Sequence, residues 1–329
     1  MIRQGIPVDK NLRRVIPGLT IQGIAVLTVT LLIVVLIPFV GPLAVIMTPL
    51  PIVYFFFRLG RMQGALALTI AFLIASAVLL LTGDRTNITV LAMICFTGAM
   101  LAEVLARRYP AERTFIIASL AVFFCGSAVL LAVSALSGVA PWQILGNHVQ
   151  GILGEHLRIS EQLNISADQI ALIRENAQEI VRFFVAIFPA LALSGAVLTV
   201  WVNVLAARLL LKHQNYGFPE FGDLSLWKAP ERLVWLLIAA GVMMLLPLEV
   251  IDSVGMNFLI VCCLVYLLQG LAIVSFFFKR KRVPTLLRWL FYLLIAVQQY
   301  MVILVIAFGL FDLWIDFRKR IAGIKDAPA

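Results

Sequence analysis

Residues 256–278 read MNFLIVCCLVYLLQGLAIVSFFF, a run of 23 residues without a charged side chain. An α-helix rises 1.5 Å per residue, so about 20 apolar residues are enough to cross a hydrocarbon core about 30 Å thick. The run therefore predicts a membrane-spanning helix. It ends at the basic cluster 279–282, which the positive-inside rule places in the cytoplasm.

Outward from this run, further apolar segments repeat the same pattern. They cover residues 19–40, 42–57, 62–82, 88–106, 114–136, 181–211, 233–248 and 286–313. Pro42, Pro49 and Pro51 interrupt the second segment, which predicts a broken or re-entrant helix there. The sequence thus predicts an all-α, polytopic membrane protein with about eight to nine transmembrane helices.

Composition and charge agree with this architecture. Of the 329 residues, 62% are hydrophobic and 13% charged, whereas soluble domains have about 45–50% apolar and about 25% charged residues. The net charge of +9 comes from short basic clusters between apolar runs. That placement indicates cytoplasmic loops rather than a nucleic-acid surface, so the expected partner is the lipid bilayer.

The charge pattern also predicts an orientation. We expect a bacterial inner-membrane protein whose basic N-terminus is cytoplasmic. With eight crossings, every loop then lies on the side that the positive-inside rule predicts. A ninth crossing would place the basic residues 318–320 outside. A hinge near Gln298 and Gln299, or a re-entrant segment 42–57, would return the C-terminus to the cytoplasm. The sequence leaves these alternatives open.

The predicted organisation has five parts. Residues 1–18 form a cytoplasmic N-terminus, and residues 19–211 a six-helix membrane domain that includes an external amphipathic segment, 138–180. An interfacial loop, 212–232, follows. Residues 233–315 supply the C-terminal transmembrane helices, and 316–329 a basic tail. Three tryptophans suit the headgroup region and are predicted interfacial anchors: Trp227, Trp235 and Trp314.

Intramembrane proteolysis would need a nucleophile with its base, a metal or paired aspartates inside the membrane. All three histidines lie outside those runs, so no serine there has a histidine base at its depth. The four cysteines lie inside apolar runs without a CxxC pair, and the sequence has no phosphate-binding loop and no dinucleotide-binding glycine motif. We therefore expect a protein that is not an enzyme and has no catalytic residue, metal or cofactor.

Polar side chains within or at the ends of apolar runs are the remaining candidates for a site, because each is costly in lipid unless paired or hydrated. They are Glu103, Asn203, Gln269, Gln298 and Gln299. Hydrogen bonding between helices is one interpretation and a shared polar cavity is the other. Asn203 and Gln269 are expected to face the protein interior. Gly270, beside Gln269, predicts a close helix crossing.

Two ion pairs are expected at helix ends. Glu103 and Arg107 are four residues apart, which predicts a helical salt bridge. Asp316 and Arg320 have the same spacing, in a C-terminal end that also carries Asp312 and Arg318 and is predicted to anchor at the interface.

The stretch Tyr266-Leu-Leu-Gln-Gly-Leu-Ala-Ile-Val and the ending Gly309-Leu-Phe-Asp-Leu-Trp-Ile-Asp-Phe-Arg-Lys-Arg resemble the YybS family of bacterial membrane proteins. The first six helices are more faintly similar to the substrate-binding S components of energy-coupling-factor transporters and to the rod-shape protein MreD. The resemblance implies an S-component-like N-terminal half followed by a C-terminal helical extension.

Two functions fit these observations. The first is a solute-binding, transport-related membrane protein, with a site between helices capped by residues 138–180. The second is a non-catalytic scaffold linked to cell-envelope or cell-shape machinery, whose partner is another membrane protein. A polar cavity would favour the first, and a packed interior with an exposed apolar groove the second.

Overall fold

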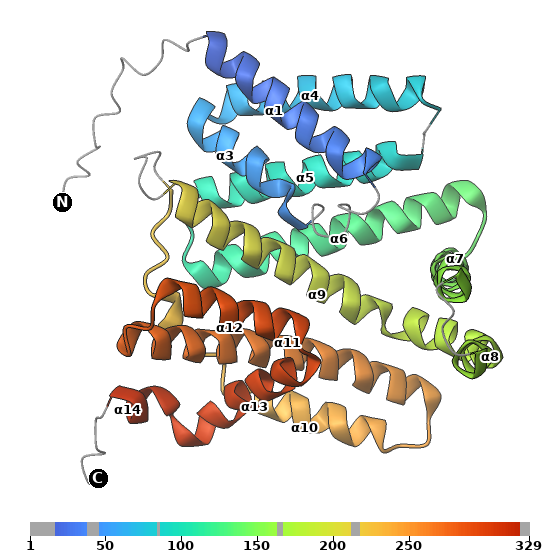
Figure 1. Ribbon diagram of the computed structural model, residues 1–329, viewed down its shortest axis with the longest axis vertical. Coiled ribbons are helices and arrows are strands. Elements are labelled where there is room, and N and C mark those ends of the chain that lie inside the picture. The colour runs from blue at the N-terminus through green and yellow to red at the C-terminus, as the bar shows by residue number, and fades with distance from the viewer. Residues whose placement is uncertain (1–16, 38–45, 84–85, 163–166, 212–217, 323–329) are drawn as a thin grey trace. The chain divides into compact units, whose positions relative to one another are not determined.

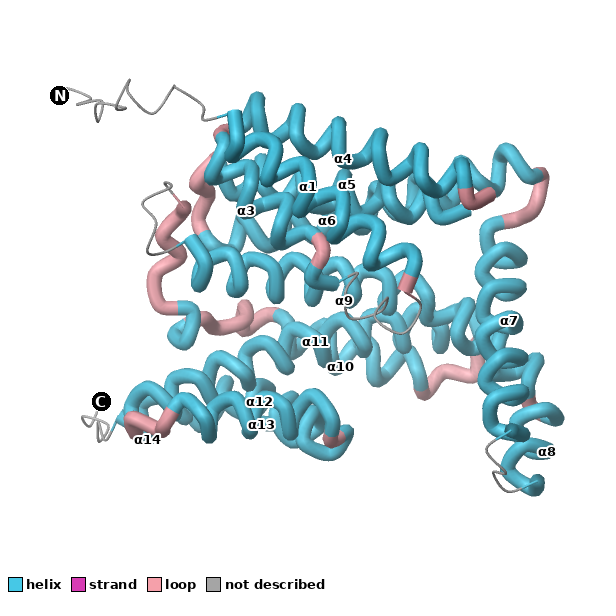
Figure 2. The backbone as a smooth tube through the Cα atoms, turned by 45° about the horizontal axis from the view of Figure 1, so that its top comes forward, coloured by secondary structure: helices cyan, strands magenta, loops and turns pink. Residues whose placement is uncertain are grey.

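The computed structural model describes residues 17–37, 46–83, 86–162, 167–211 and 218–322. These residues form helices and connecting loops, with no β-strand among them (Figure 2). The predicted all-α class is therefore confirmed. The predicted N-terminal part, 1–18, and Pro42 lie almost wholly outside the described residues.

The helices follow the apolar runs of the sequence. In chain order they are α1 (Pro17–Leu36), α3 (Pro49–Leu59), α4 (Arg61–Leu81), α5 (Thr86–Ala106), α6 (Ala111–Ser137), α7 (Pro141–Gln162), α8 (Ala167–Glu175), α9 (Ala177–Leu211), the 3₁₀ turn η2 (Leu224–Leu226), α10 (Leu233–Met244), α11 (Glu249–Arg280), α12 (Thr285–Val297), α13 (Gln299–Ile315) and α14 (Phe317–Ala322) (Figure 1).

The chain divides into two compact units. Unit 1 comprises Met1–Val129 and Gly195–Glu220, and unit 2 comprises Leu130–Ser194 and Phe221–Ala329. The boundaries at Val129 and Ser194 fall inside α6 and α9, so each of these helices contributes to both units. The predicted membrane domain, 19–211, was defined by which residues lie in the bilayer, whereas these units are defined by contacts within the chain. The membrane domain therefore stays a prediction.

Unit 1 has its core where α1, α3, α4 and α5 pack together. Each of the four helices contributes at least one fully buried side chain: Leu27, Ile52, Ala71 and Leu91. Gly60 alone joins α3 to α4, with a φ of 85°, which glycine adopts without steric cost. The sharp turn brings Gly64 of α4 against the backbone of Phe56.

Unit 2 is centred on α11, which packs against α10, η2, α13 and α14. A methyl group added to Gly270 would overlap the carbonyl oxygen of Val305, and one added to Gly309 would overlap that of Tyr266. Helices α11 and α13 therefore cross with their backbones in contact. The close crossing predicted from Gly270 is confirmed.

Within the described part of the chain, five helices are long and apolar enough to cross a membrane: α4, α5, α6, α9 and α11. The α12–α13 pair meets these criteria only jointly, and it bends by 105° at the break. Among the described residues, α1, α3 and α10 form shorter apolar helices. With 11 residues, α3 extends about 16 Å, roughly half of a hydrocarbon core. Length and composition thus support fewer spans than the predicted eight to nine.

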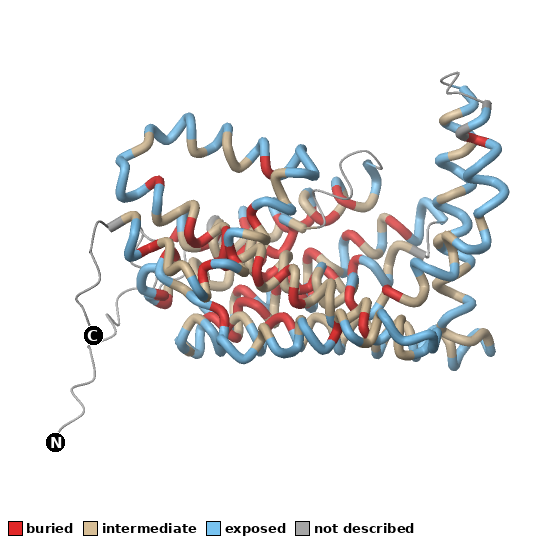
Figure 3. The backbone as a smooth tube through the Cα atoms, turned by 90° about the horizontal axis from the view of Figure 1, so that it is seen from below, coloured by how far each residue is buried: buried red, intermediate tan, exposed pale blue. Residues whose placement is uncertain are grey.

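The segment predicted to be external, 138–180, is mostly helical, as expected. Helices α7 and α8 contact each other, and Arg174 of α8 forms an ion pair with Glu161 of α7. No residue of α7 is buried, and both helices are largely exposed (Figure 3). Their position outside the membrane stays a prediction.

Candidate functional site

A buried polar network joins α11, α13 and α14 in unit 2. The Asp312 carboxylate accepts hydrogen bonds from Gln269 Nε2 at 3.1 Å, from Arg318 Nη1 at 2.6 Å and from the Phe317 backbone N–H at 2.9 Å. The side chains of Arg318 and Asp312 are 6% and 0% exposed. A buried charge pair is tolerable only when its remaining hydrogen-bonding groups are also satisfied, and this one has several partners.

The rest of the network is backbone from the loop around η2. Arg318 Nε donates to the Ser225 carbonyl oxygen at 3.1 Å, and Arg318 Nη2 donates to that of Trp227 at 2.7 Å. Gln269 Oε1 accepts the Ala229 N–H at 3.1 Å. Gln269 is 1% exposed, so its predicted inward orientation is confirmed. The donors and acceptors of the network are bonded to one another, so its role is structural. We call Gln269, Asp312, Arg318 and the loop backbone that they bind the clamp.

The same loop is also tied to the end of α11. Lys279 Nζ lies 2.5 Å from Asp223 Oδ1 and 3.3 Å from Ser225 Oγ. Partial burial opposes ionisation of Asp223, but hydrogen bonds from Lys279 and Ser225 outweigh it and lower the pKa of Asp223 to about 2. The loop therefore holds the C-terminal ends of α11 and α13 together through one set of contacts.

This tether fixes the course of the C-terminal helices. Helix α12 begins at Thr285, shortly after α11 ends at Arg280, and Arg288 of α12 donates to the carbonyl oxygens of Val283 and Phe278. Helix α13 ends at the Asp312 network, which contacts α11 at Gln269 and is linked to Lys279, at the end of α11, through Ser225 of the η2 loop. The α12–α13 pair therefore leaves the end of α11, bends by 105°, and is tied back toward that end through the η2 loop and α14; we call this bent pair the hairpin. A hinge near Gln298 and Gln299 was one of the alternatives that the sequence left open, and the structure has a break there.

The tip of this hairpin is polar and exposed. Gln298 lies at the break with a φ of −98° and a ψ of 107°, outside the helical region. Gln298, Gln299 and Tyr300 are all exposed. These two amides thus differ from Gln269, which the fold buries in the clamp.

Asn203 of α9 occupies a comparable position in unit 1. Its Nδ2 donates to the carbonyl oxygens of Ile46, at 2.6 Å, and Thr199, at 2.7 Å. Ile46 precedes α3, so the amide holds the backbone at the start of the interrupted segment. Asn203 is fully buried, as predicted, and its Oδ1 has no hydrogen-bond partner within the described part of the chain.

Glu103 forms a helix-end ion-pair cluster. Its carboxylate lies 2.5 Å from Arg61 Nη2 at the start of α4 and 3.2 Å from Arg107 Nε. The predicted pair with Arg107 is confirmed, and Arg61 is an additional partner that comes from a different helix. The Glu103 side chain is 27% exposed, so it is not a deeply buried acid.

The C-terminal end departs from expectation in two respects. Asp316 pairs with Lys228 and Lys319, each at 3.3 Å, and not with Arg320 as its spacing predicted. Asp316 has a φ of 44° and ends α13, and its carboxylate lies beside Lys228 of the loop and Lys319 of α14. Asp312 and Arg318, predicted at the interface, are buried because they pair with each other and with loop carbonyls.

The predicted aromatic anchors differ in exposure. Trp235 and Trp314 are exposed by 71% and 66%, as residues at a membrane surface can be. Trp227 is only partly exposed, and its carbonyl oxygen belongs to the clamp. Their role as membrane anchors stays a prediction.

Sequence reasoning missed Asn257. This α11 residue donates from Nδ2 to the Ala186 carbonyl oxygen at 2.8 Å and accepts the Ala190 N–H at 2.9 Å. Pro189 lies between those two α9 residues, where proline removes a backbone donor. A neighbouring helix thus bonds to the interrupted backbone. An Asn in one apolar run and a Pro in another were the sequence signals that could have suggested this contact.

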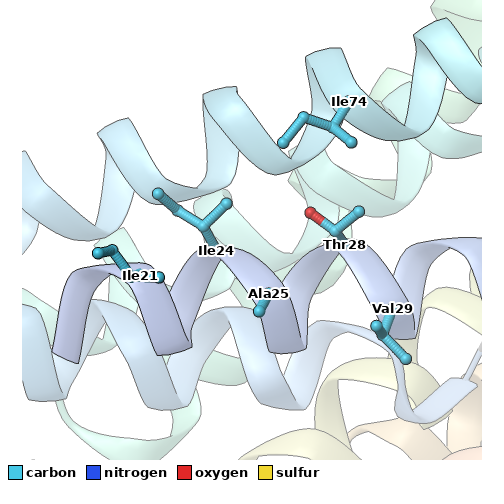
Figure 4. A pocket seen from close by; sticks show the side chains of 6 residues that line it. All are labelled: Ile21, Ile24, Ala25, Thr28, Val29 and Ile74. Carbon is cyan, nitrogen blue, oxygen red and sulfur yellow. The ribbon is translucent and has the colours of Figure 1, made fainter. Parts of the chain in front are cut away.

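An apolar groove lies between α1 and α4 in unit 1. It is lined by Ile21, Ile24, Ala25, Thr28, Val29 and Ile74 (Figure 4). Thr28 is 9% exposed, and its hydroxyl has no hydrogen-bond partner among the described residues. The lining suits an acyl chain or an apolar helix and offers little to a polar solute.

Comparison with known proteins places the chain in one family. The model of that family, described as a predicted membrane protein (DUF2232), matches residues 24–313. No curated protein and no solved structure matches the chain significantly. With most of its length covered by the family model, the chain belongs to the DUF2232 family of predicted membrane proteins.

Proposed function

We propose that this protein is a non-catalytic, transport-related membrane protein that binds a small polar solute at the tip of the α12–α13 hairpin. In this proposal it lies in a bacterial inner membrane with its N-terminus in the cytoplasm, as its basic loops suggest. The faint similarity of the first six helices to S components agrees with a solute-binding role.

The exposed polar tip carries the proposal. Helix α12 has 13 residues and extends about 20 Å from the end of α11. In a hydrocarbon core about 30 Å thick, the tip would lie well below the headgroups. Non-helical backbone at that depth is tolerated only inside protein or beside water. The exposed amides of Gln298 and Gln299 therefore favour a hydrated cavity that a hydrogen-bonding solute can enter.

Each compact unit contains an interrupted apolar segment held by a buried amide. In unit 1 Asn203 holds the backbone before α3, and in unit 2 Gln269 belongs to the clamp that holds α13. Transporters commonly form their sites from discontinuous helices in both halves of the chain. The two interruptions support a solute-binding role.

The decisive experiment measures water at the tip. Gln298→Cys and Gln299→Cys would be made in a background lacking the four native cysteines and treated in proteoliposomes with a membrane-impermeant thiol reagent. We expect both to react and a copurified or added solute to protect them. Leu293→Cys, exposed on the same hairpin, is the lipid-facing control and should not react. Failure of both tip cysteines to react would refute the proposal.

A scaffold role is the second candidate, and the groove between α1 and α4 favours it. Its apolar lining, with the unpartnered hydroxyl of Thr28, suits a transmembrane helix of another protein. A photo-crosslinking residue at Ala25 would join a discrete membrane protein in cells if the groove docks one. Crosslinks to lipid alone would count against this role.

A further inference from the structure

We propose that the turn between α11 and α12, together with the exposed face of α12, binds an anionic phospholipid. The headgroup lies at Lys281 and Arg282, and an acyl chain lies along α12. This site is separate from the solute site proposed at the hairpin tip.

Lys281 and Arg282 carry positive charge at this turn that no described acid neutralises. Residues 279–282 are four consecutive basic side chains. Lys279 pairs with Asp223, whereas Lys281 and Arg282 are exposed and form no ion pair within the described ranges. The guanidinium of Arg288 donates to the carbonyl oxygens of Val283 and Phe278, so it caps the turn without losing its charge to a carboxylate.

The backbone at Arg282 indicates that its charge has a role. The Arg282 N–H bonds to the Lys279 carbonyl oxygen at 3.2 Å and the Val283 N–H to that of Phe278 at 3.0 Å, which is the Schellman pattern. Arg282 fills the left-handed position of this motif with a φ of 51°, where glycine is the unstrained choice. An arginine there projects a cation from the end of α11, where the helix dipole also favours positive charge.

An apolar stripe begins directly after the basic turn. Leu286, Leu290, Leu293 and Val297 are spaced to share one face of α12, and their exposures are 79%, 60%, 60% and 75%. Trp289, beside this stripe near the start of α12, is 66% exposed and suits the headgroup level. A cationic turn continued by an apolar stripe matches a phospholipid, with its phosphate above its acyl chain, better than a free anion.

The test uses the full chain in a neutral detergent and follows its thermal midpoint, Tm, by intrinsic tryptophan fluorescence. Phosphatidylglycerol should raise Tm, and phosphatidylcholine should not. Arg282→Gly and Lys281→Gln should each weaken the apparent affinity for phosphatidylglycerol about fivefold, the equivalent of one surface charge. Without lipid, Arg282→Gly should not lower Tm, because glycine suits the left-handed backbone.

Two control variants and one free anion distinguish phospholipid binding from a general effect of charge. Arg158→Gln, on the exposed surface of α7, removes a charge elsewhere and should keep the wild-type response. Leu290→Gln should weaken the response to the lipid through the lost acyl contact. An equal Tm gain from inorganic phosphate would mean a free-anion site and overturn the proposal. An unchanged phosphatidylglycerol response in both Arg282→Gly and Lys281→Gln would also overturn it.

Discussion

The guanidinium of Arg318 lies 2.6 Å from the carboxylate of Asp312, six residues earlier, and both side chains are buried. The pair closes the end of α13 onto α11 and the η2 loop. It therefore decides where the C-terminal hairpin ends.

Removing either charge should destabilise the protein strongly. Asp312→Ala or Arg318→Ala leaves a buried ion without its partner, which typically costs about 3–5 kcal/mol. Thermal unfolding in detergent measures the loss. The double variant should lose less than the sum of the two, because neither charge is then unpaired. Asp316→Asn, which removes a more exposed charge and keeps a residue that tolerates the left-handed backbone, should stay within about 1 kcal/mol of wild type. Additive losses at Asp312 and Arg318 would contradict their coupling.

The crossing of α11 and α13 should not tolerate a single extra methyl group. Gly270→Ala places a Cβ on the carbonyl oxygen of Val305, and such overpacking costs about 1–3 kcal/mol or more. Gly241→Ala in α10 is the matched control, because nothing lies within 4 Å of the added atom. Alanine is the better helix former, so the control should be neutral or slightly stabilising. Equal unfolding midpoints for the two variants would show that the crossing is loose.

Asn257 and Pro189 should be energetically coupled. Asn257→Ala removes two hydrogen bonds to the α9 backbone beside the proline, which we expect to cost about 1–3 kcal/mol. In a Pro189→Ala background the same substitution should cost less, because a regular helix satisfies its own backbone. A double-mutant cycle on unfolding free energies measures the difference. A coupling energy of zero would show that Asn257 does not compensate for the backbone interruption at Pro189.

The η2 loop should respond to acid pH through Asp223. Its pKa is about 2 in the folded protein, below the ordinary 3.8, so its contribution to stability is present above pH 3.8 and is lost as pH falls through 2. The Asp223 side chain is 44% exposed, so solvent screening keeps the effect small. Hydrogen exchange of residues 223–229 between pH 5 and 2 should show the loosening. Asp223→Asn should already be loosened at pH 5 and should show less change with pH.

The hairpin makes a topological prediction. Lys281→Cys and Arg320→Cys should react with an impermeant reagent from one side of the membrane, since the hairpin leaves the end of α11 and is tied back toward that end through the η2 loop. Gln150→Cys and Glu161→Cys should react from the other side, if the α7 segment is external. Labelling in intact cells and in inverted vesicles distinguishes the sides. Reaction of positions 281 and 320 from opposite sides would mean that α12 and α13 cross the membrane together.

The sequence by itself determined the class of this protein. Long uncharged runs such as 256–278 expose too much apolar surface to be stable in water. In lipid a helix satisfies its own backbone hydrogen bonds, so composition and run length were sufficient to predict a helical membrane protein. The same logic placed Asn203 and Gln269 inside, because an unpaired amide is costly in hydrocarbon. The polar step at Gln298 and Gln299 offered a hinge as one alternative, and the structure decided that the helix breaks there.

Only the tertiary structure decided how those polar groups are used. The spacing of Asp316 and Arg320 predicted a local pair, but a left-handed residue ends α13 and redirects the side chains, so Arg318 reaches Asp312 and the loop carbonyls instead. Asn257 bonds to Ala190, the residue after Pro189, across 67 positions of the sequence, a contact that no local pattern encodes. Periodicity and composition report local preferences, whereas a buried hydrogen bond depends on which distant backbone the fold brings within about 3 Å.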